Sequence, residues 1–288
     1  MGTGTMFSKV DLTHAYQQME LTNTSKEYLT INTHRGLYSY QRLTYGIATA
    51  PSIFQAMMDQ VLVNIKGVKC RIDDIAICTA PEDHLKTVDE VLTRLAKYGI
   101  KANWDKCEFA KAKIEYVGYE VDKDGRHPMQ DKVKAIREAP HPTNVQELRS
   151  YLGLLNFYGN FIPNLSTLLS PLHELLHQKT KWSWSTECEE AFKKSKAALL
   201  ENDVLVSYDP SKKLILATDA CPTGVGAVLS HVINGVERPV AFASRTLTAS
   251  EKNYAQIEKE ALGIVYGVRK SKSTSMDGHF IYSLIISL

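Results

Sequence analysis

The sequence lacks long hydrophobic runs and paired cysteine motifs. No apolar run reaches the roughly 18 residues of a membrane-spanning helix, and the N-terminal stretch "MGTGTMFSKV" has no apolar signal-peptide core. We therefore expect an intracellular protein that is neither secreted nor bound in a membrane. The cysteines, Cys70, Cys78, Cys107, Cys188 and Cys221, are odd in number and form no CxxC pair. This usage favours reduced thiols over a disulfide framework or a zinc site.

A strong charge bias is also absent. Lys and Arg number 34 against 32 Asp and Glu, a net charge of +2, which does not by itself indicate nucleic-acid binding. Apolar residues make up 44% and charged residues 23%, as in ordinary globular proteins. The 288 residues allow one large domain or two to three ordinary ones. The last ten residues, "HFIYSLIISL", end without a cap or polar close, so we expect a truncated C-terminus.

The first part of the chain alternates between strand and helix patterns. "FSKVDL" predicts a strand ending at Asp11, and "YLTINT" and "LYSYQRL" predict a hairpin around "HRG". Helical spacing begins at Pro51. "KCRIDDIAICT" predicts two strands whose tight turn falls on Asp73 and Asp74. A helix with its apolar stripe then ends at Gly99, and "IEYVGYEV" predicts one further strand. The stripe consists of Leu85, Val88, Leu92 and Leu95.

The rest of the chain changes pattern twice. Residues 140–202 look helical, with the stripe Val145, Leu148, Leu152 and Leu155. Possible capping boxes are Thr143 with Gln146, Thr186 with Glu189, and Thr248 with Glu251. "LILATDA", "GVGAVLSHV" and "RPVAFASR" predict three strands before a helix through about Arg269. The order is mixed α/β to about residue 125, helical to about 202, and β-β-β-α to about 270.

Three carboxylates define the first candidate site. Asp11 ends one predicted strand, and Asp73 and Asp74 lie in a hairpin turn. If these strands are neighbours, like charges converge at one sheet edge, which is unfavourable without a cation. Oxygen ligands suit Mg²⁺ or Mn²⁺, and two metals would suit phosphoryl transfer. The alternative is a solvated Asp-Asp turn and a strand-end Asp that caps the next turn.

The second candidate site pairs Asp219, at the end of the strand "LILAT", with Glu260 on the following helix. The neighbours Leu262, Ile264, Val265 and Val268 would give that helix a buried face. The pair could hold a second metal. In the alternative reading, Glu260 is a solvated residue in a charged run that begins at Glu258.

The order of these motifs resembles the polymerase of gypsy-type LTR retrotransposons and retroviruses. The resemblance runs from about Phe7 to Arg269. "FSKVDLTHAYQQM", "YSYQRLTYGIATAPSIFQAMM", "RIDDIAI" and "VGYEV" resemble the first catalytic strand, the palm helix with its loop, the catalytic hairpin and the primer grip. "LRSYLGLLNFYGNFIPNLSTLLSPLHELL" and "WSWSTECEEAF" resemble the thumb and connecting segment. "LATDACPTGVGAVLSH" and the motifs to "EKEAL" resemble the start of an RNase H domain.

This resemblance implies an α/β (α+β) fold in three parts. Residues 1–125 would form the palm and partial fingers of a right-hand polymerase, and residues 126–205 a helical thumb or connection. Residues 206–288 would form a partial, truncated RNase H-like β-β-β-α unit, in which the resemblance fades after residue 269.

The resemblance also implies roles for individual residues. Asp11, Asp73 and Asp74 would hold two Mg²⁺ (or Mn²⁺) ions while a primer 3′-hydroxyl attacks a dNTP. Asp219 and Glu260 would be two of four carboxylates that hold metal to cleave RNA in an RNA–DNA hybrid. The implied partners are an RNA template, a DNA primer, the RNA–DNA hybrid and dNTPs.

Four residues would contact substrates. Tyr16 matches the aromatic steric gate against ribose, and Tyr45 a residue near the incoming nucleotide. Gly118 and Tyr119 match the primer grip. Both Tyr16 and Tyr45 could instead be core tyrosines.

The sequence departs from the family at four places. The upstream fingers segment with its dNTP-binding cations is missing, and Arg71 stands where the family has tyrosine. Arg71 could pair with Asp73 or Asp74 and compete with metal, or reach a backbone phosphate. In "LTYG", Thr44 and Tyr45 replace the family's Pro and Phe. The tail has only Asp277 as an acid, outside any matching motif, so we expect a half-built sheet with an unpaired edge and no RNase H activity.

Two functions remain open at this point. One is an RNA-directed DNA polymerase with a vestigial RNase H unit. The other is a decayed retroelement fragment with weak nucleic-acid binding. An unrelated Mg²⁺ phosphohydrolase is disfavoured by the thumb-like helical middle.

Overall fold

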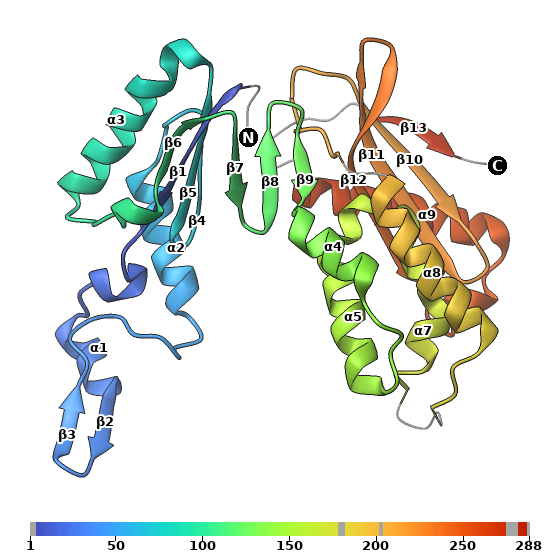
Figure 1. The fold of residues 1–288 in the computed structure, drawn as a ribbon, viewed down its shortest axis with the longest axis horizontal. Coiled ribbons are helices and arrows are strands. Elements are labelled where there is room, and N and C mark those ends of the chain that lie inside the picture. Colours follow the sequence, from blue (N-terminus) through green and yellow to red (C-terminus); the bar gives the residue numbers. More distant parts are fainter. Residues whose placement is uncertain (1–3, 178–181, 202–203, 275–281, 287–288) are drawn as a thin grey trace. The chain divides into compact units, whose positions relative to one another are not determined.

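The computed structural model describes residues 4–177, 182–201, 204–274 and 282–286. The chain divides into two compact units, Met1–Lys123 and Asp124–Leu288, which are described separately below (Figure 1). The three-part division at residues 125 and 205 stays a prediction. All five cysteines are free, as predicted. No helix in the described part of the chain is long and apolar enough to cross a membrane.

The first unit is built on a four-stranded sheet with the order β4-β5-β1-β6. Its strands are β1 (Met6–Asp11), β4 (Val68–Arg71), β5 (Asp74–Thr79) and β6 (Glu108–Lys111). Two helices, α2 (Ala50–Val61) and α3 (Pro81–Lys97), pack on one face (Figure 1). The apolar residues facing the helices include Val10, Ile75 and Ile77, each essentially without solvent exposure. The strands and helices therefore follow the predicted pattern.

The opposite face of the sheet receives a hairpin. Strands β7 (Lys113–Tyr116) and β8 (Tyr119–Asp122) pair antiparallel, so the prediction of one continuous strand in "IEYVGYEV" was wrong. Val117 and Gly118 form the turn with φ of 50° and 78°, the two positive values of a type I′ turn. The hairpin packs on Phe7, Ala76 and Cys78. It thus covers the half of this face that lies away from Asp11.

The predicted small hairpin is present beside a short helix. Strands β2 (Thr30–Thr33) and β3 (Gly36–Ser39) pair antiparallel and follow α1 (Asn23–Tyr28). Thr22 caps α1 by accepting from the backbone N–H of Ser25. The short 3₁₀ helices of this unit are η1 (Ala15–Gln18) and η2 (Trp104–Lys106).

Helix α3 buries a different stripe from the predicted one. Gly99 follows its end with φ of 69°, as predicted for a glycine after a helix. Leu85, however, is 75% exposed, and His84 is fully buried in its place. His84 Nε2 lies 2.7 Å from Ser8 Oγ, and its Nδ1 lies 2.8 Å from Thr79 Oγ1. These two hydroxyls make a buried histidine acceptable, which a stripe read from apolar residues alone could not reveal.

Acid is expected to destabilise the first unit through His84. Burial lowers the pKa of this imidazole below its usual value. Between the lowered and the ordinary pKa the unfolded chain therefore binds more protons than the folded one. The free energy of unfolding should fall as pH drops below about 6.5, by at most about 1.4 kcal/mol per pH unit for one group. Urea unfolding from pH 7.5 to 5 measures this slope.

The matched comparison for that slope uses two glutamine variants. His84→Gln should weaken the pH dependence, whereas His34→Gln, at an exposed hairpin turn, should keep it. Equal slopes for the wild type and His84→Gln would contradict the prediction.

The second unit begins with helices. After β9 (Arg126–Pro128), they are α4 (Gln130–Glu138), α5 (Val145–Phe157), η3 (Gly159–Phe161), α6 (Leu165–Leu168), α7 (Ser170–Glu174) and α8 (Thr186–Glu201). The predicted caps are displaced by one residue. Asn144 caps α5 by accepting from the N–H groups of Gln146 and Glu147, and Glu147 accepts in return from Thr143 N. Asparagine is as good a cap as threonine, and it stands one position closer to the stripe.

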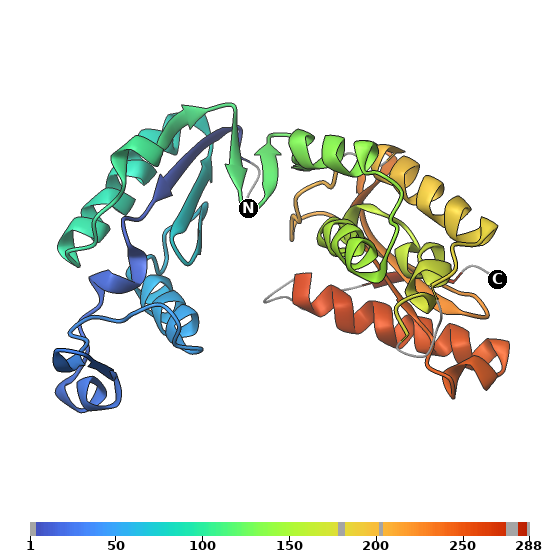
Figure 2. The same ribbon diagram turned by 60° about the horizontal axis from the view of Figure 1, so that its bottom comes forward.

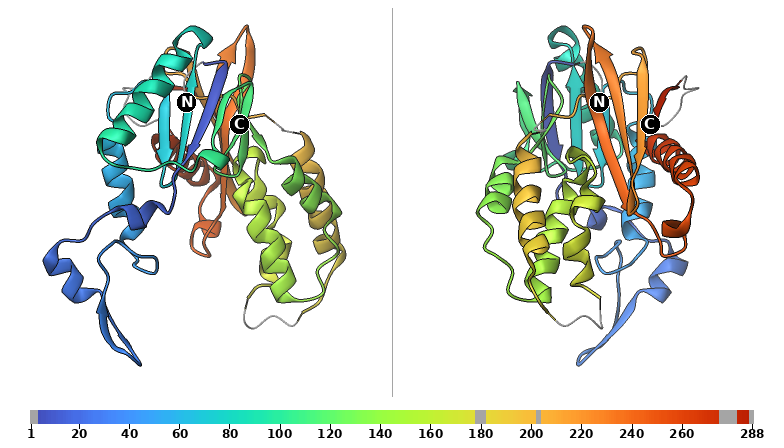
Figure 3. Two further views of the ribbon diagram at one scale, coloured as in Figure 1. Left: turned by 60° about the vertical axis from the view of Figure 1, so that its left-hand side comes forward. Right: turned by 90° about the vertical axis from the view of Figure 1, so that its right-hand side faces the viewer.

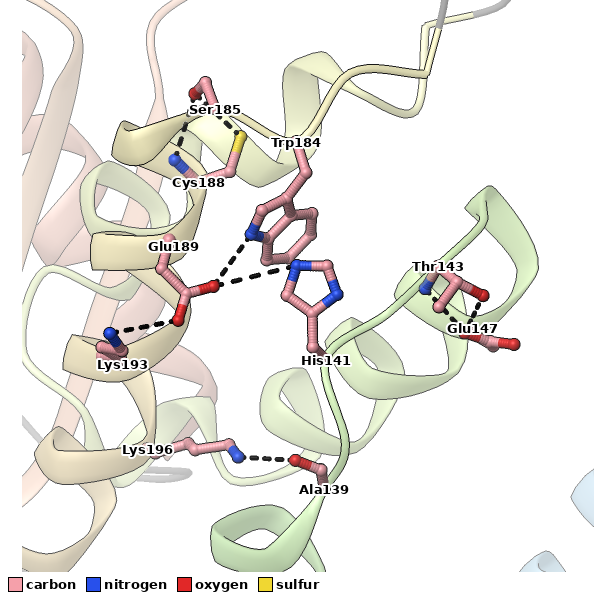
Figure 4. A network of polar contacts seen from close by, with 10 residues as sticks. All are labelled: Ala139, His141, Thr143, Glu147, Trp184, Ser185, Cys188, Glu189, Lys193 and Lys196. Carbon is pink, nitrogen blue, oxygen red and sulfur yellow. Dashed lines mark hydrogen bonds and ion pairs between the residues drawn. The ribbon is translucent and has the colours of Figure 1, made fainter.

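A polar and aromatic network joins the loop after α4 to the start of α8 (Figure 4). The His141 ring meets Trp184 edge-on with centroids 4.2 Å apart. The Trp184 indole donates to Glu189 Oε2 at 2.9 Å, and Lys193 pairs with the other oxygen at 3.2 Å. The Glu189 carboxylate thus accepts from the indole of Trp184 instead of from the backbone at the helix start. Ser185 Oγ accepts from Cys188 N there. The predicted box of Thr186 with Glu189 was therefore wrong.

The second unit ends in a sheet with the order β12-β11-β10-β13. Its strands are β10 (Leu214–Ala220), β11 (Gly224–Ile233), β12 (Val236–Thr246) and β13 (Tyr282–Ile286). Strand β13 pairs parallel to β10 as a fourth strand, so the expectation of a half-built sheet that ends with the three predicted strands was wrong. Asp277 lies outside the described residues.

Helix α9 (Gln256–Thr274) packs on one face of this sheet, and α6 packs on the other. Figures 2 and 3 show α9 and the helices α5–α8 on opposite sides of the strands. The contact face of α9 includes the buried small residues Gly263, Gly267 and Ser271, whereas Val265 is 47% exposed. The predicted Leu262 and Val268 pack against the sheet beside them. The predicted apolar face was therefore wrong at Val265. The Thr248–Glu251 box forms reciprocally, but it caps the short η4 (Glu251–Asn253) before α9.

Candidate active site

Strand register brings the first three carboxylates to one edge of the sheet. Asp11, the last residue of β1, lies directly opposite Asp74, the first residue of β5. Asp73 precedes Asp74 in the turn, and its carbonyl accepts from Leu12 N at 3.0 Å. Strands β1 and β5 are therefore neighbours, as the predicted convergence of the three carboxylates required. Asp11 and Asp74 are half-buried and Asp73 is exposed.

The hairpin turn falls one residue earlier than predicted, on Ile72 and Asp73. Ile72 has φ of 57°, a left-handed conformation that is costly for a β-branched residue. The side chain of Gln55 on α2 holds this turn. Its Oε1 accepts from Ile72 N at 2.8 Å, and its Nε2 donates to the carbonyl of Cys70 at 3.0 Å. Gln55 thus fixes the backbone from which Asp73 and Asp74 project.

If the three carboxylates catalyse nucleotide addition, as the sequence resemblance implies, replacing Gln55 by methionine should reduce it about 10- to 100-fold, because small displacements of catalytic groups have effects of that size. Methionine keeps the length and apolar stem but offers neither bond to the turn. Primer extension by purified Gln55→Met measures the loss. The matched control is Gln60→Met, at an exposed position of the same helix, which should extend at the wild-type rate. Full activity of Gln55→Met would show that the turn holds its shape unaided.

The electrostatics of the site fit a bound cation. Burial raises the pKa of Asp11, and the negative charges of Asp74 and Asp73 raise it further, while Lys106 and Lys9 oppose them. Lys9 Nζ lies 3.1 Å from Asp74 Oδ1. A lysine is therefore the present partner of one carboxylate, and a divalent ion would relieve the same repulsion. Within the described ranges, however, no three His, Cys, Asp or Glu side chains lie close enough together to hold a metal ion.

Arg71 makes no ion pair with the candidate carboxylates among the described residues. It lies opposite Asp74 across the hairpin and is exposed, but the ion pair of Asp74 is made by Lys9. In the described part of the chain Arg71 forms no ion pair with Asp73 or Asp74. Of the two arrangements open from the sequence, competition with metal is therefore not the one observed.

The two candidate substrate tyrosines meet each other. Tyr16, in η1, stands with its ring centroid 5.2 Å from that of Tyr45 and 5.7 Å from that of Phe54. Phe54 is fully buried and Tyr45 is 57% exposed. Tyr45 is therefore not a core tyrosine. Tyr16 is half-buried, with one ring neighbour in the core and the other at the surface.

Gly118 and Tyr119 lie in the β7–β8 hairpin. Gly118 is the second turn residue, and Tyr119 begins β8 and packs beside Phe7 and Ala76. Phe7 is on β1 and Ala76 on β5. The hairpin therefore lies on the sheet face that also carries Asp11 and Asp74.

Asp219 and Glu260 are placed differently from the first cluster. Asp219 is exposed and lies opposite Gly226, where an added Cβ would collide with Asn164 Oδ1. Opposite residues of an antiparallel pair point to the same face, so Asp219 projects toward the side of Asn164. It lines a hollow of about 200 Å³ with Pro163 and Asn164. Helix α9, which carries Glu260, packs on the other face.

Glu260 is not a solvated helix residue. Its Oε1 accepts from Gln256 Nε2 at 2.7 Å, and its Oε2 is buried without a hydrogen-bond partner. Gln256 also donates to the carbonyl of Ala220 at 2.9 Å. None of the described residues donates to Oε2, and the structure does not bring Glu260 and Asp219 together on one face.

Two site residues were not identified from the sequence. Lys9 lies two residues before Asp11 on the same strand face, a spacing that could have suggested a charge partner. Gln55 gave no signal, because an amide on a helix is usually solvated. Its role depends on the contact between α2 and the hairpin, which is tertiary.

Comparison with known proteins was consistent along the chain. Residues 1–121 match the family "Reverse transcriptase (RNA-dependent DNA polymerase)", and residues 184–282 match "RNase H-like domain found in reverse transcriptase". The chain is 36% identical over 285 residues to the retrovirus-related Pol polyprotein from transposon 297 of Drosophila melanogaster. It is 34% identical over 269 residues to the transposon Tf2-3 polyprotein of Schizosaccharomyces pombe. The chain belongs to the reverse transcriptases of LTR-retrotransposon Pol polyproteins.

This reverse transcriptase region covers only part of its relatives. The matches include 98% and 92% of the chain but 26% and 20% of the two polyproteins. Members of the family use divalent metal ions. The mixed α/β fold, a polymerase domain followed by an RNase H-like domain, is the predicted one.

Solved structures share this fold. The foamy viral protease-reverse transcriptase in complex with RNA/DNA hybrid matches with a TM-score of 0.87 and 24% identity, over 99% of this chain and 39% of that one. Its dRH form in complex with double-stranded DNA matches with a TM-score of 0.84 and 24% identity, over 99% and 51%.

Proposed function

We propose that the first unit adds dNTPs to a DNA primer on an RNA template, as an RNA-directed DNA polymerase. The observation that carries the proposal is the placement of Asp11 directly opposite Asp74, with Asp73 in the adjoining turn. The sheet face around them also carries the β7–β8 hairpin.

Asp11, Asp73 and Asp74 would hold Mg²⁺ or Mn²⁺, which supplies charge stabilisation for the attacking and leaving oxygens. Lys9 Nζ forms an ion pair with Asp74 Oδ1 at 3.1 Å and so holds that side chain in place. Gln55 fixes the turn. Tyr16, supported by Phe54, would stand against a ribose 2′-hydroxyl, and Tyr45 near the incoming nucleotide. Gly118 and Tyr119 would contact the primer.

Primer extension tests the proposal. Purified chain is given a labelled DNA primer on an RNA template, with dNTPs and Mg²⁺ or Mn²⁺. Extension that is lost on addition of a chelator supports a polymerase. Binding of the duplex without extension would instead indicate a decayed retroelement fragment.

The RNase H-like unit is proposed not to cleave RNA. Two observations support this: Asp219 projects toward the face of α6, and Glu260 is carried by α9 on the opposite face. Hydrolysis of the labelled RNA strand of an RNA–DNA hybrid by purified protein, lost in Asp219→Asn, would overturn it.

A further inference from the structure

The edge strand of the catalytic sheet carries two cations beside the acidic cluster. Strand β4 is the last strand of the sheet, and its Lys69 and Arg71 are both exposed. The strand alternates, because Val68 and Cys70 pack toward the α2–α3 core. Lys69 and Arg71 therefore project to the other face, which also carries Asp11 and Asp74.

Neither cation is used within the unit. Arg71 lies opposite Asp74 and Lys69 opposite Ala76. The carboxylate next to Arg71 is already paired with Lys9 at 3.1 Å. Among the described residues, neither Lys69 nor Arg71 forms an ion pair. An exposed guanidinium that pairs with none of the three neighbouring carboxylates is available for an external anion.

The half-buried Tyr116, on β7, shares this sheet face with Arg71. Tyr116 packs with Phe7, Ala76 and Cys78 under the β7–β8 hairpin. Lys69 and Arg71 are both exposed on the same face of the sheet.

The spacing of the two cations matches a nucleic-acid strand. Residues i and i+2 of an extended strand are about 6.8 Å apart. Phosphates of one nucleic-acid strand recur about every 3.4 Å of helix axis, so the separation of the two cations equals about two such steps. An arginine binds a phosphate through two parallel N–H groups and a lysine through one charge.

We propose that Lys69 and Arg71 bind backbone phosphates of one strand of the primer–template duplex and so hold its end at the carboxylate cluster. The inference rests on the proposed polymerase function and adds specific anchoring residues to it. Arg71 is then a positioning residue, and it replaces an aromatic contact with an ionic one.

Salt-dependent binding tests this inference without catalysis. A fluorescein-labelled hybrid of DNA primer and RNA template is titrated with purified chain in EDTA, from 50 to 300 mM KCl. The variants are Arg71→Gln, Lys69→Gln and the double variant, each checked for an unchanged Tm. The matched control is Lys97→Gln, an exposed lysine at the end of α3 on the opposite face of the sheet.

Each lost phosphate contact should reduce the slope of log K against log[salt] by about 1. Each single variant should also bind about tenfold more weakly at low salt, as expected for a lost charged hydrogen bond. The double variant should lose a slope of about 2, and Arg71→Lys should retain most of the slope because it keeps the charge. Lys97→Gln should match the wild type.

Slopes that are the same in the wild type, Arg71→Gln and Lys69→Gln would overturn the inference, as would a wild type that does not bind the hybrid. A wild type that binds with the expected slope but does not extend a primer would overturn the polymerase proposal alone. The variant Arg71→Tyr further separates the anchoring inference from the polymerase proposal. Stronger hybrid binding by that variant than by the wild type would show that arginine is a defect, and would contradict an anchoring role.

Discussion

Asp73→Asn is expected to reduce primer extension at least about 10³-fold while the Tm stays unchanged. Asp73 is the most informative of the three acids because its side chain contributes least to the stability of the fold. It is exposed, lies in the turn, and makes no ion pair within the described residues. Asp74, in contrast, is paired with Lys9, and Asp11 is half-buried. Asparagine keeps the shape of the side chain and removes the charge that a divalent ion needs.

The matched control for Asp73→Asn is Asp89→Asn, an exposed acid on α3 on the far face of the same sheet. That variant should extend primers at the wild-type rate. Removing one of three crowded negative charges should if anything stabilise the metal-free fold. A loss of activity accompanied by a lower Tm would therefore contradict the assignment, and so would an active Asp73→Asn.

Gly67→Ala is expected to lower the free energy of unfolding of the first unit by about 2–4 kcal/mol. Gly67 has φ of 75° and precedes β4 at the base of the catalytic hairpin. A Cβ at this position would collide with the carbonyl oxygen of Cys78 and lie 2.8 Å from Thr79 Cγ2. Because Cys78 N donates to the carbonyl of Gly67 at 2.8 Å, the two backbones cannot separate without losing that bond.

Gly99→Ala separates the collision from the backbone conformation. Gly99 has a similar φ of 69°, but a Cβ there has no atom within 4 Å. Its substitution should cost only the left-handed conformation, about 1–2 kcal/mol. Urea unfolding of both variants measures the difference. Equal losses in Gly67→Ala and Gly99→Ala would show that the hairpin base adjusts freely to a methyl group.

Much of the fold was predictable because binary patterns and turn residues specify it locally. The strands around Asp11 and Asp219 and the helix from Pro51 follow their periodicities. The errors occurred where one residue decides between near-equivalent local structures. Val117 and Gly118 adopt a turn although Val117 is a β-branched residue, and Asn144 takes the cap from Thr143. In each case a tertiary contact or a better cap outweighs the sequence pattern.

The candidate site was predictable in its acids but not in its supports. Asp11, Asp73 and Asp74 could be found because carboxylates at strand ends are unusual and chemically specific. The spacing of Lys9 and Asp11 could have suggested a charge partner, but its pairing with Asp74 depends on which strand lies beside β1. Gln55 could not be found, because its importance depends on which helix meets the hairpin turn. The role of Arg71 depended on the same information, because Lys9 already pairs with Asp74, the carboxylate opposite Arg71.

The small-residue face of α9 limits how this helix can change. An added Cβ at Gly267 would lie 2.9 Å from Thr218 Cγ2 and 3.2 Å from Ala227 Cβ, and Gly263 and Ser271 occupy the same face one turn to either side. The helix rests on β10 almost backbone to strand. Larger side chains are therefore not tolerated at Gly263, Gly267 or Ser271 as long as β10 and β11 are unchanged. An increase in side-chain volume at one of these positions would have to be matched by a loss of volume in β10 or β11.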